Sequence, residues 1–322
     1  MFENTHFPNA KKFWYMGKLF EWEESTVHVM SHALHYGSSV FEGIRAYNTS
    51  KGPAIFRLPE HMDRFLHSSS VLHMDVPYSK QEIIDIILHV MKENLLDTAY
   101  IRPLLFYSYG NLGLVPKHSK VELLVAAWKW GAYLGEAAQR GTRVNIVPFR
   151  RIHHSQFDQK AKLGGLYVLS TISGVAARNK GYDEAVYLNL EGNIAEGPGE
   201  NIFIIKDGVI KTNDMSESIL EGITRTSILK LASDIGMECL VGPITKNDFF
   251  EADEAFFTGT AAEIVSIVHV TDDSDPANAG KEYSIGTGKL GDITQRIKKL
   301  YLEVVKGQHE NYSDWLTYVY KK

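Results

Sequence analysis

The sequence predicts an α+β protein with two domains, and three observations support this fold class. The chain has 322 residues, a length that suits two packed domains better than one small domain. Short apolar runs of strand length alternate with longer segments in which apolar residues recur at helical spacing. Three glycines interrupt residues 130–141, which is typical of a connection. We therefore expect a smaller α+β domain over residues 1–133, an interdomain connection over 134–141 and a larger domain over 142–322.

The smaller domain is expected to open with a β-hairpin over residues 13–22, because aromatic and apolar residues flank a turn at Gly17. A helix is expected from Pro59, since proline is favoured in the first helical turn. Another helix is expected from Ser79, where Glu82 stands three residues later and completes a capping box. The other strands expected in this domain are residues 43–47, 54–58, 98–107 and 121–128.

The larger domain is expected to contain a hairpin over residues 202–211 that turns at Asp207-Gly208. Its helices are expected over residues 222–235, where Gly236 ends the helix, and over 293–306. Cys239 is expected to be a small core residue. The other strands expected in this domain are residues 142–149, 184–190, 254–257 and 264–270.

Composition and charge exclude several classes of protein. The net charge is −5, and no run of lysine and arginine with interleaved aromatic residues indicates a nucleic-acid surface. No apolar segment reaches membrane-spanning length, and the first residues lack the apolar core of a signal peptide. The single cysteine excludes an intrachain disulfide framework and fits a reducing compartment. We therefore expect a cytoplasmic protein that binds neither nucleic acid nor membrane.

Lys162, which a Leu-Gly-Gly sequence follows, is the strongest candidate for a reactive residue. A lysine that forms a covalent bond must reach a carbonyl carbon unprotonated, and a glycine pair leaves room for a ligand near the backbone. The apolar residues that follow predict a buried helix with Lys162 at its mouth and Tyr167 about a turn and a half along it. Lys160 is the nearby alternative. The apolar residues of this expected helix are Leu166, Leu169, Ile172, Val175 and Ala176.

Three further segments suggest a bound cofactor. The helix expected from Gly222 would offer N–H groups to a phosphate, and Thr224 would add a hydroxyl. A glycine turn at Gly259 and Thr260 would expose further N–H groups. Glu196 lies in a loop of glycines and proline, where its carboxylate can be held against a protonated ring nitrogen. Taken singly, these segments are more typical of an ordinary helix start, a tight turn and a solvated loop acid.

His28, His32 and His35 have a spacing that could suit a metal ion on one helix. No cysteine or carboxylate completes a ligand set at the required spacing. We therefore expect packing or loop histidines and no metal site.

Seven motifs follow one another along the chain, at residues 32–45, 99–103, 130–133, 162–165, 196–201, 222–225 and 259–263. Together they resemble the branched-chain-amino-acid aminotransferases, which are fold-type IV pyridoxal-phosphate enzymes of the D-amino-acid-aminotransferase-like architecture. The resemblance covers about residues 13–305. It implies pyridoxal 5'-phosphate as the cofactor and transfer of an amino group between L-leucine, L-isoleucine or L-valine and 2-oxoglutarate.

The resemblance also implies roles for single residues. Lys162 would carry the cofactor covalently and move the proton of the substrate Cα, Tyr167 would contact the ring hydroxyl, and Glu196 would contact the pyridine nitrogen. Arg102 would take the distal carboxylate of glutamate. The residues implied at the cofactor phosphate are Arg57, Ile223, Thr224 and Thr260. The other residues implied around the substrate are Phe41, Gly43, Tyr100, Tyr133, Thr260 and Ala261.

In this family the loop that corresponds to residues 109–114 closes over the neighbouring subunit's site, so a homodimer or higher homo-oligomer is expected. Two alternatives share the fold, a D-amino-acid aminotransferase and a lyase acting on aminodeoxychorismate. The Phe-Glu-Gly-Ile-Arg sequence at 41–45 and the Tyr-Ile-Arg-Pro sequence at 100–103 favour the branched-chain enzyme. An alternative of another class is a non-catalytic relative that binds a ligand or partner. The joint presence of the lysine, tyrosine, glutamate and phosphate turn counts against it.

Overall fold

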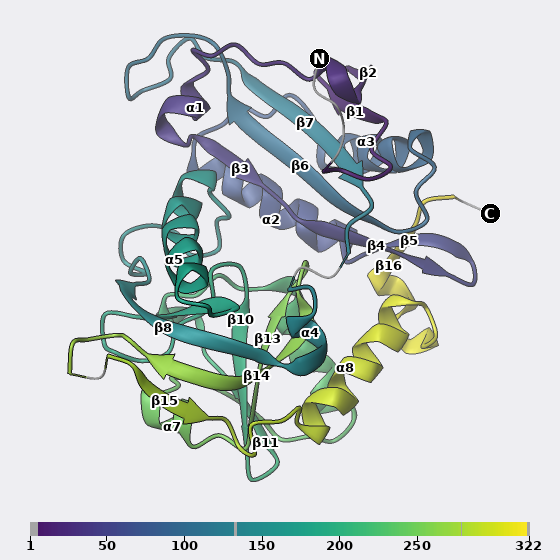
Figure 1. The fold of residues 1–322 in the computed structure, drawn as a ribbon. Coiled ribbons are helices and arrows are strands. Elements are labelled where there is room, and N and C mark those ends of the chain that lie inside the picture. The colour runs from purple at the N-terminus through teal and green to yellow at the C-terminus, as the bar shows by residue number, and fades with distance from the viewer. Residues whose placement is uncertain (1–5, 132–133, 278, 321–322) are drawn as a thin grey trace. The chain divides into compact units, whose positions relative to one another are not determined.

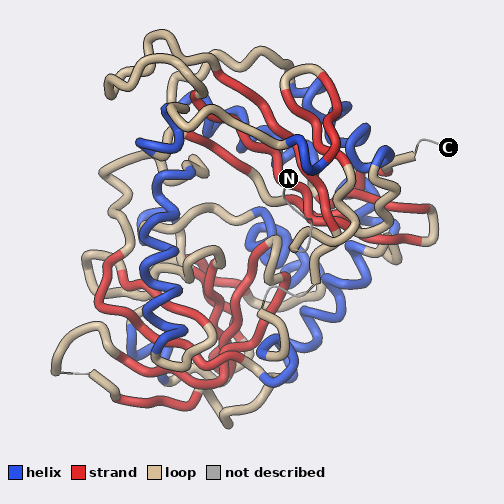
Figure 2. Tube along the Cα trace, turned by 45° about the horizontal axis from the view of Figure 1, so that its top comes forward, coloured by secondary structure: helices blue, strands red, loops and turns tan. Residues whose placement is uncertain are grey.

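The computed structural model describes residues 6–131, 134–277 and 279–320. Contacts divide the chain into two compact units, each built from a sheet and helices, as Figures 1 and 2 show. Unit 1 consists of Met1–Gly131, Lys160–Leu166 and Glu303–Lys322, and unit 2 consists of Ala132–Gln159 and Tyr167–Leu302.

Unit 1 contains an antiparallel sheet in the strand order β16-β5-β4-β6-β7-β1-β2, with β3 paired to β6. Helices α2 and α3 contact each other and pack against strands of this sheet. The strands are β1 (Lys12–Tyr15), β2 (Lys18–Glu21), β3 (Ser39–Phe41), β4 (Ile44–Thr49), β5 (Gly52–Phe56), β6 (Ala99–Tyr107), β7 (Val121–Trp128) and β16 (Leu316–Tyr318). The helices are η1 (Trp22–Glu24), α1 (His32–Tyr36), α2 (Leu58–Val71), α3 (Lys80–Glu93), η2 (Gly164–Leu166) and η4 (Glu310–Trp315).

Local sequence signals in unit 1 are confirmed where they involve turns and caps. β1 and β2 form the expected hairpin, and Gly17 supplies its positive φ of 95°. Ser79 caps α3 in the expected capping box with Glu82. The expectation that Arg57 lies on a strand is wrong. β5 ends at Phe56, and Arg57 is the N-cap of α2 with a φ of 51°.

Unit 2 contains a mixed sheet in the strand order β12-β11-β10-β13-β14-β8-β9, with β15 paired to β14. β8 lies between β14 and β9 and runs parallel to both. The strands are β8 (Thr142–Arg150), β9 (Glu184–Leu188), β10 (Asn201–Lys206), β11 (Val209–Thr212), β12 (Cys239–Val241), β13 (Glu254–Gly259), β14 (Glu263–Asp272) and β15 (Lys281–Ser284). The helices are α4 (Ala137–Arg140), α5 (Tyr167–Asn179), η3 (Met215–Glu217), α6 (Ile223–Asp234), α7 (Lys246–Phe250) and α8 (Asp292–Val305), whose last three residues belong to unit 1.

The interior of unit 2 is made largely by its strands. One apolar cluster joins β-branched and aromatic residues of β8, β9, β10, β13 and β14 with Phe249 of α7. The expected hairpin with its turn at Asp207-Gly208 is confirmed as the β10–β11 pair. Cys239 is half-buried at the start of β12 and is therefore only a partial core residue.

The helix after Lys162 is not the buried helix that its apolar spacing predicts. It begins at Tyr167, after the short 3-10 helix η2, and Ile172 and Val175 are about half exposed at 48% and 53%. Its fully buried residues are the small Ser173 and Ala177. Small side chains let α5 approach β8 and β9 closely. Leu169 packs against the core beside Ala177, whereas Ile172 and Val175 face away from it.

The two units differ from the expected domain division in two segments. Lys160–Leu166, which includes Lys162, packs with unit 1, although it was expected in the larger domain. Glu303–Lys322 also joins unit 1, because β16 pairs with β5. Both segments are held by partners far away in sequence, which local patterns do not reveal.

Among the residues that the structure describes, no helix is long and apolar enough to cross a membrane.

Candidate active site

Three contacts within unit 1 fix the position of Lys162. Its main-chain N–H donates to the Ser68 hydroxyl at 2.8 Å, and its carbonyl accepts from the Phe41 N–H at 3.4 Å. Its Nζ lies 4.8 Å from the centroid of the Phe41 ring. The next residue, Leu163, forms a β-bridge with Val40. The lysine is therefore attached to both α2 and β3.

The glycine pair after Lys162, Gly164 and Gly165, lies close to another segment of the same chain, residues 37–39. A Cβ on Gly164 would lie 2.2 Å from the Ser39 hydroxyl. A Cβ on Gly37 would lie 2.7 Å from the Cα of Gly165. Larger residues would push the lysine segment away from β3, so these glycines are needed for packing whether or not a ligand also lies there.

Phe41, Gly43, Tyr100 and Arg102, which were expected around the substrate, are brought together at the strands β3, β4 and β6. The Arg102 guanidinium lies 4.7 Å from the centroid of the Phe41 ring and donates a hydrogen bond of 2.9 Å to the Tyr100 hydroxyl. A Cβ on Gly43 would lie 2.0 Å from that hydroxyl, so glycine is required there. Tyr133, expected in the same pocket, lies outside the described residues.

The surroundings of Tyr100 include an aromatic residue that was not among those expected around the substrate. The Trp130 ring stands edge-on to the Tyr100 ring, with their centroids 4.5 Å apart. Its place in the motif at residues 130–133, together with Tyr133, could have indicated that it lies there.

A buried charged cluster lies next to Phe41 in sequence and was also missed. Glu42 is fully buried and accepts from His61 Nδ1 at 2.8 Å and from Arg64 Nε at 2.6 Å. Burial opposes ionisation of Glu42, but Arg64 and His61 hold the pKa of its carboxyl well below the usual range. Burial lowers the pKa of His61, and the charges of Arg64 and Lys162 add to that effect. Glu42 is therefore a buried anion that Arg64 and His61 stabilise.

Arg57, expected at the cofactor phosphate, lies at the start of α2 with its side chain engaged. Its guanidinium forms an ion pair with Glu60 and lies 4.7 Å from the Trp315 ring centroid. Arg64 lies on the same helix as Ser68, one turn before it, and Ser68 contacts Lys162. The Arg64 side chain is 13% exposed and pairs with the buried Glu42.

Glu196 of unit 2 is buried and held by three donors. Its carboxylate accepts from Arg151 Nε at 2.6 Å, from the Leu220 N–H at 3.0 Å and from the Asn201 amide at 3.2 Å. Burial lowers the pKa of Arg151, but the charge of Glu196 outweighs it and raises that pKa, with a smaller contribution from Tyr167. Glu196 is therefore a fixed anion rather than a solvated loop acid.

Asn201 connects Glu196 to the two other segments expected around a cofactor. Its side-chain amide also donates to the Leu220 carbonyl at 2.8 Å, and a Cβ on Gly222 would lie 2.1 Å from its Oδ1. Its backbone pairs with Thr258, which precedes the glycine turn. The loop of Glu196, the start of α6 and the end of β13 therefore meet around one asparagine.

The expected phosphate-binding residues of unit 2 lie at these two segments. Gly222 is the N-cap of α6, and Ile223 and Thr224 are its first two residues, both buried. Thr260 and Ala261 form the tight turn between β13 and β14, in which Gly259 pairs with Glu263. N–H groups at a helix N-terminus and in a tight turn can bind an anion.

Tyr167 is the first residue of α5 and is half-buried. Its phenol is close enough to Arg151 to interact with it, so Tyr167 belongs to the same neighbourhood as Glu196. The boundary between the two units falls between Leu166 and Tyr167, so the segment from Lys162 to Tyr167 connects them along the chain.

The three histidines with metal-like spacing have other contacts in unit 1. His32 contacts the Ser38 hydroxyl at 2.7 Å and the Gly113 carbonyl at 3.0 Å. His35 contacts the Val29 carbonyl at 3.0 Å, and the His28 ring packs against Tyr109. Only His32 and His35 lie on α1, which has five residues.

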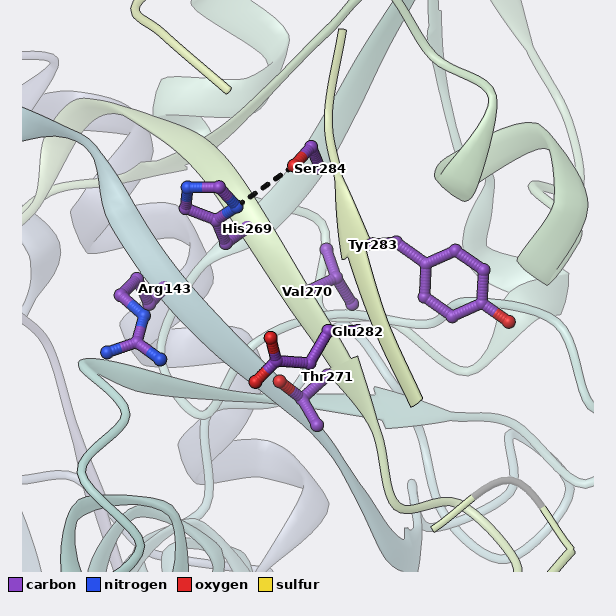
Figure 3. Close-up of a pocket in the computed structure, with 7 residues that line it drawn as sticks. All are labelled: Arg143, His269, Val270, Thr271, Glu282, Tyr283 and Ser284. Carbon is purple, nitrogen blue, oxygen red and sulfur yellow. Dashed lines mark hydrogen bonds between the residues drawn. The ribbon is translucent and has the colours of Figure 1, made fainter. Parts of the chain in front are cut away.

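A separate hollow of about 400 Å³ lies on unit 2 along β8, β14 and β15. Figure 3 shows its polar side chains, with a contact of 3.3 Å between His269 and Ser284. None of the expected site residues lines it, so it is not the candidate active site. Its lining residues are Arg143, His269, Val270, Thr271, Glu282, Tyr283 and Ser284.

Comparison with known proteins gives matches over nearly the whole chain. A family model described as amino-transferase class IV matches residues 39–270. The chain is 44% identical to a branched-chain-amino-acid aminotransferase of Pseudomonas aeruginosa, over 95% of this chain and 96% of that protein. The solved T.th. branched-chain amino acid aminotransferase, complexed with N-(5'-phosphopyridoxyl)-L-glutamate, matches with a TM-score of 0.88 and 41% identity, over 97% of this chain and 100% of that chain. The structure of the same enzyme complexed with 4-methylvaleric acid gives the same values.

Proposed function

Because this chain belongs to the class IV aminotransferases and, within them, to the branched-chain-amino-acid aminotransferases, we propose that it transfers amino groups between L-leucine, L-isoleucine or L-valine and 2-oxoglutarate. Family membership confirms the expected fold type and enzyme class. We also propose that 2-oxoglutarate is the amino acceptor and that the single residues have the roles described below.

One observation supports the substrate pair most directly, namely that Arg102 and Lys162 both lie against the Phe41 ring. Such an enzyme must accept a branched aliphatic chain and a charged glutamate chain in one pocket. Apolar walls bind the first, and an arginine at the edge offsets the cost of burying the carboxylate of the second. The T.th. enzyme has been solved with ligands of both kinds, a glutamate adduct and 4-methylvaleric acid.

We propose pyridoxal 5'-phosphate as the cofactor, and the residues present fit its chemistry. Lys162 provides an amine for the aldehyde, Glu196 a buried anion for the ring nitrogen, and Tyr167 a phenol for the ring hydroxyl. When bound, this cofactor supplies an electron sink for the charge that develops at the substrate Cα. The lysine Nζ then moves the Cα proton, and Arg151 keeps Glu196 ionised.

The phosphate is proposed to bind the N–H groups of Ile223 and Thr224 at the start of α6 and of Thr260 in the turn. The resemblance supports Arg57 as the cation of this site. Arg64, on the same helix, is instead committed to the buried Glu42, to which its Nε donates at 2.6 Å and its Nη2 at 2.9 Å.

We further propose that the protein is a homodimer or higher homo-oligomer. In unit 1, the segment around α1 and the loop over residues 109–115 expose several large apolar side chains. The loop is attached to α1 by the Tyr36 hydroxyl, which donates to the Leu112 carbonyl at 2.8 Å. A surface of this kind is typical of an interface. Its exposed residues are Val27, Val29, Met30, Leu34, Tyr36, Tyr109, Leu114 and Val115. A cytoplasmic location is proposed from the single cysteine, Cys239.

The absorption spectrum of the purified protein tests the activity. With pyridoxal 5'-phosphate bound, we expect a visible band that L-leucine abolishes and 2-oxoglutarate restores, whereas D-alanine leaves it unchanged. The Lys162→Ala variant should bind the cofactor noncovalently and fail to transaminate. A response to D-alanine alone would show a D-amino-acid aminotransferase, and no band after addition of the cofactor would favour a non-catalytic relative.

A further inference from the structure

Ser68 is a fully buried residue of α2 whose hydroxyl makes two hydrogen bonds. It donates to the Arg64 carbonyl at 2.7 Å, within the helix. It accepts from the main-chain N–H of Lys162 at 2.8 Å, across 94 residues of sequence. A hydroxyl is the smallest side-chain group that can donate and accept at the same time.

The Lys162 N–H does not take part in the regular hydrogen bonding of a strand or a helix. Lys162 precedes η2, which begins at Gly164, and the β-bridge to Val40 starts only at Leu163. The other main-chain bond of Lys162, from the Phe41 N–H to its carbonyl, is long at 3.4 Å. The short bond to Ser68 is therefore the stronger restraint on the lysine main chain.

We propose that Ser68 is a positioning residue for Lys162, because its hydroxyl holds the lysine backbone to α2 and so fixes the origin of the reactive side chain. The inference rests on the proposed function of Lys162. A displacement of about 1 Å at a reacting group can cost about a hundredfold in rate. Loss of this bond should therefore reduce the chemical step more than substrate binding.

The adjacent Ser69 is a control for the general contribution of a buried serine to the packing of α2. It is 2% exposed, and its hydroxyl donates to the Leu66 carbonyl at 2.7 Å, also within the helix. The two serines thus lie on the same helix, are both buried, and each donate a hydrogen bond to a carbonyl of that helix. They differ in the bond that Ser68 accepts from Lys162.

The experiment compares Ser68→Ala with Ser69→Ala, first without cofactor. Hydrogen exchange of the Lys162 amide should be about tenfold faster in Ser68→Ala and unchanged in Ser69→Ala. With pyridoxal 5'-phosphate bound, kcat for L-leucine should fall about tenfold or more in Ser68→Ala with little change in KM. Ser68→Cys, which keeps the volume but is a poor acceptor, should show both effects in weaker form and serves if the alanine variant does not fold.

Unchanged exchange in both Ser68 variants would overturn the proposal whatever their activity. Fast exchange of the Lys162 amide in Ser68→Ala together with a wild-type kcat would also overturn it. So would a loss of kcat in Ser69→Ala equal to that in Ser68→Ala. The exchange measurement does not depend on catalysis. If the wild-type protein did not transaminate, the proposed function would fail while the bond from Lys162 to Ser68 could still be measured.

Discussion

Arg102 has a hydrogen-bonding group for which the described part of the chain supplies no partner. Its Nη2 donates to Tyr100, but its Nε is buried and, among the residues that the structure describes, has no hydrogen-bond partner. An unpaired buried donor of a guanidinium is costly, and an incoming carboxylate would satisfy it. This is the physical basis for expecting that Arg102 distinguishes glutamate from leucine.

We predict that Arg102→Ala slows the half-reaction with L-glutamate about tenfold to a hundredfold and the half-reaction with L-leucine much less. The rate of loss of the visible cofactor band measures each half-reaction separately. Arg102→Lys is the control, because it keeps the charge but loses the planar fork of donors. Equal losses with both substrates would remove the proposed role.

Arg57 and Arg64 can be distinguished by the cofactor itself. We predict that Arg57→Gln reduces the preference of the apoprotein for pyridoxal phosphate over pyridoxal by about tenfold or more, since a charge-assisted contact to phosphate is lost. Arg64→Gln should change this ratio less, because the Arg64 guanidinium is engaged with the buried Glu42. Binding is measured by titration of the apoprotein. The opposite order would make Arg64 the phosphate cation.

At the scale of single elements, the contact between His61 of α2 and Glu42, which lies between β3 and β4, predicts a pH dependence of stability. The pKa of His61 lies below its ordinary value of 6.5 in the folded state, and the pKa of Glu42 lies below 4.5. In both cases the unfolded chain takes up the proton first as pH falls. The contribution of His61 is present above pH 6.5 and is lost below it. The contribution of Glu42 is lost in a second range below pH 4.5.

The free energy of unfolding, measured with urea from pH 8 to pH 3, should therefore fall in two steps on acidification. His61→Gln should remove the first step. Glu42→Gln should make the second step smaller without removing it, because the pKa values of Glu82, Asp248, Asp253 and Asp273 are also lowered. Each variant should be less stable at neutral pH. If the free energy of unfolding depended on pH in the same way in the wild type and in both variants, His61 and Glu42 would not be the groups responsible.

Sequence patterns predicted the elements of this fold well where the cause is local. The Ser79 capping box and the turns at Gly17 and Gly208 follow from the chemistry of a few adjacent residues, and the structure confirms all three. α5 was misread because apolar spacing shows that a helix has an apolar face but not what covers it. The face toward the sheet is the one with Ser173 and Ala177. The site residues came from resemblance, and the pocket residues Phe41, Gly43, Tyr100 and Arg102 do lie together.

What the sequence could not show is which distant segments hold these residues. Ser68, Arg151 and Asn201 act through contacts with residues far away along the chain, so no local pattern distinguishes them from other polar residues. Lys162 belongs to unit 1 for the same reason, because its contacts are with residues far away along the chain.

At the scale of the whole molecule, the apolar surface around α1 predicts self-association. We expect Leu114→Glu, at a residue that is 81% exposed, to lower the mass in solution, because a charge cannot be buried unpaired in an interface. Leu95→Glu is the matched control, since Leu95 is 75% exposed but lies outside this surface, just after α3. Sedimentation equilibrium measures the mass. If Leu114→Glu kept the wild-type mass, the surface would not be the interface.

The assembly of unit 1 from three separate stretches of chain has a consequence for biosynthesis. β5 leaves the ribosome long before β16, its partner in the sheet, and Ser68 long before Lys162. Until Tyr318 has been made, the β5 edge of the nascent sheet stays open, and an open edge can pair with another chain. Unit 1 must therefore complete its folding after translation of nearly the whole chain. During that interval, chaperones that cover strand edges would have the greatest effect on yield.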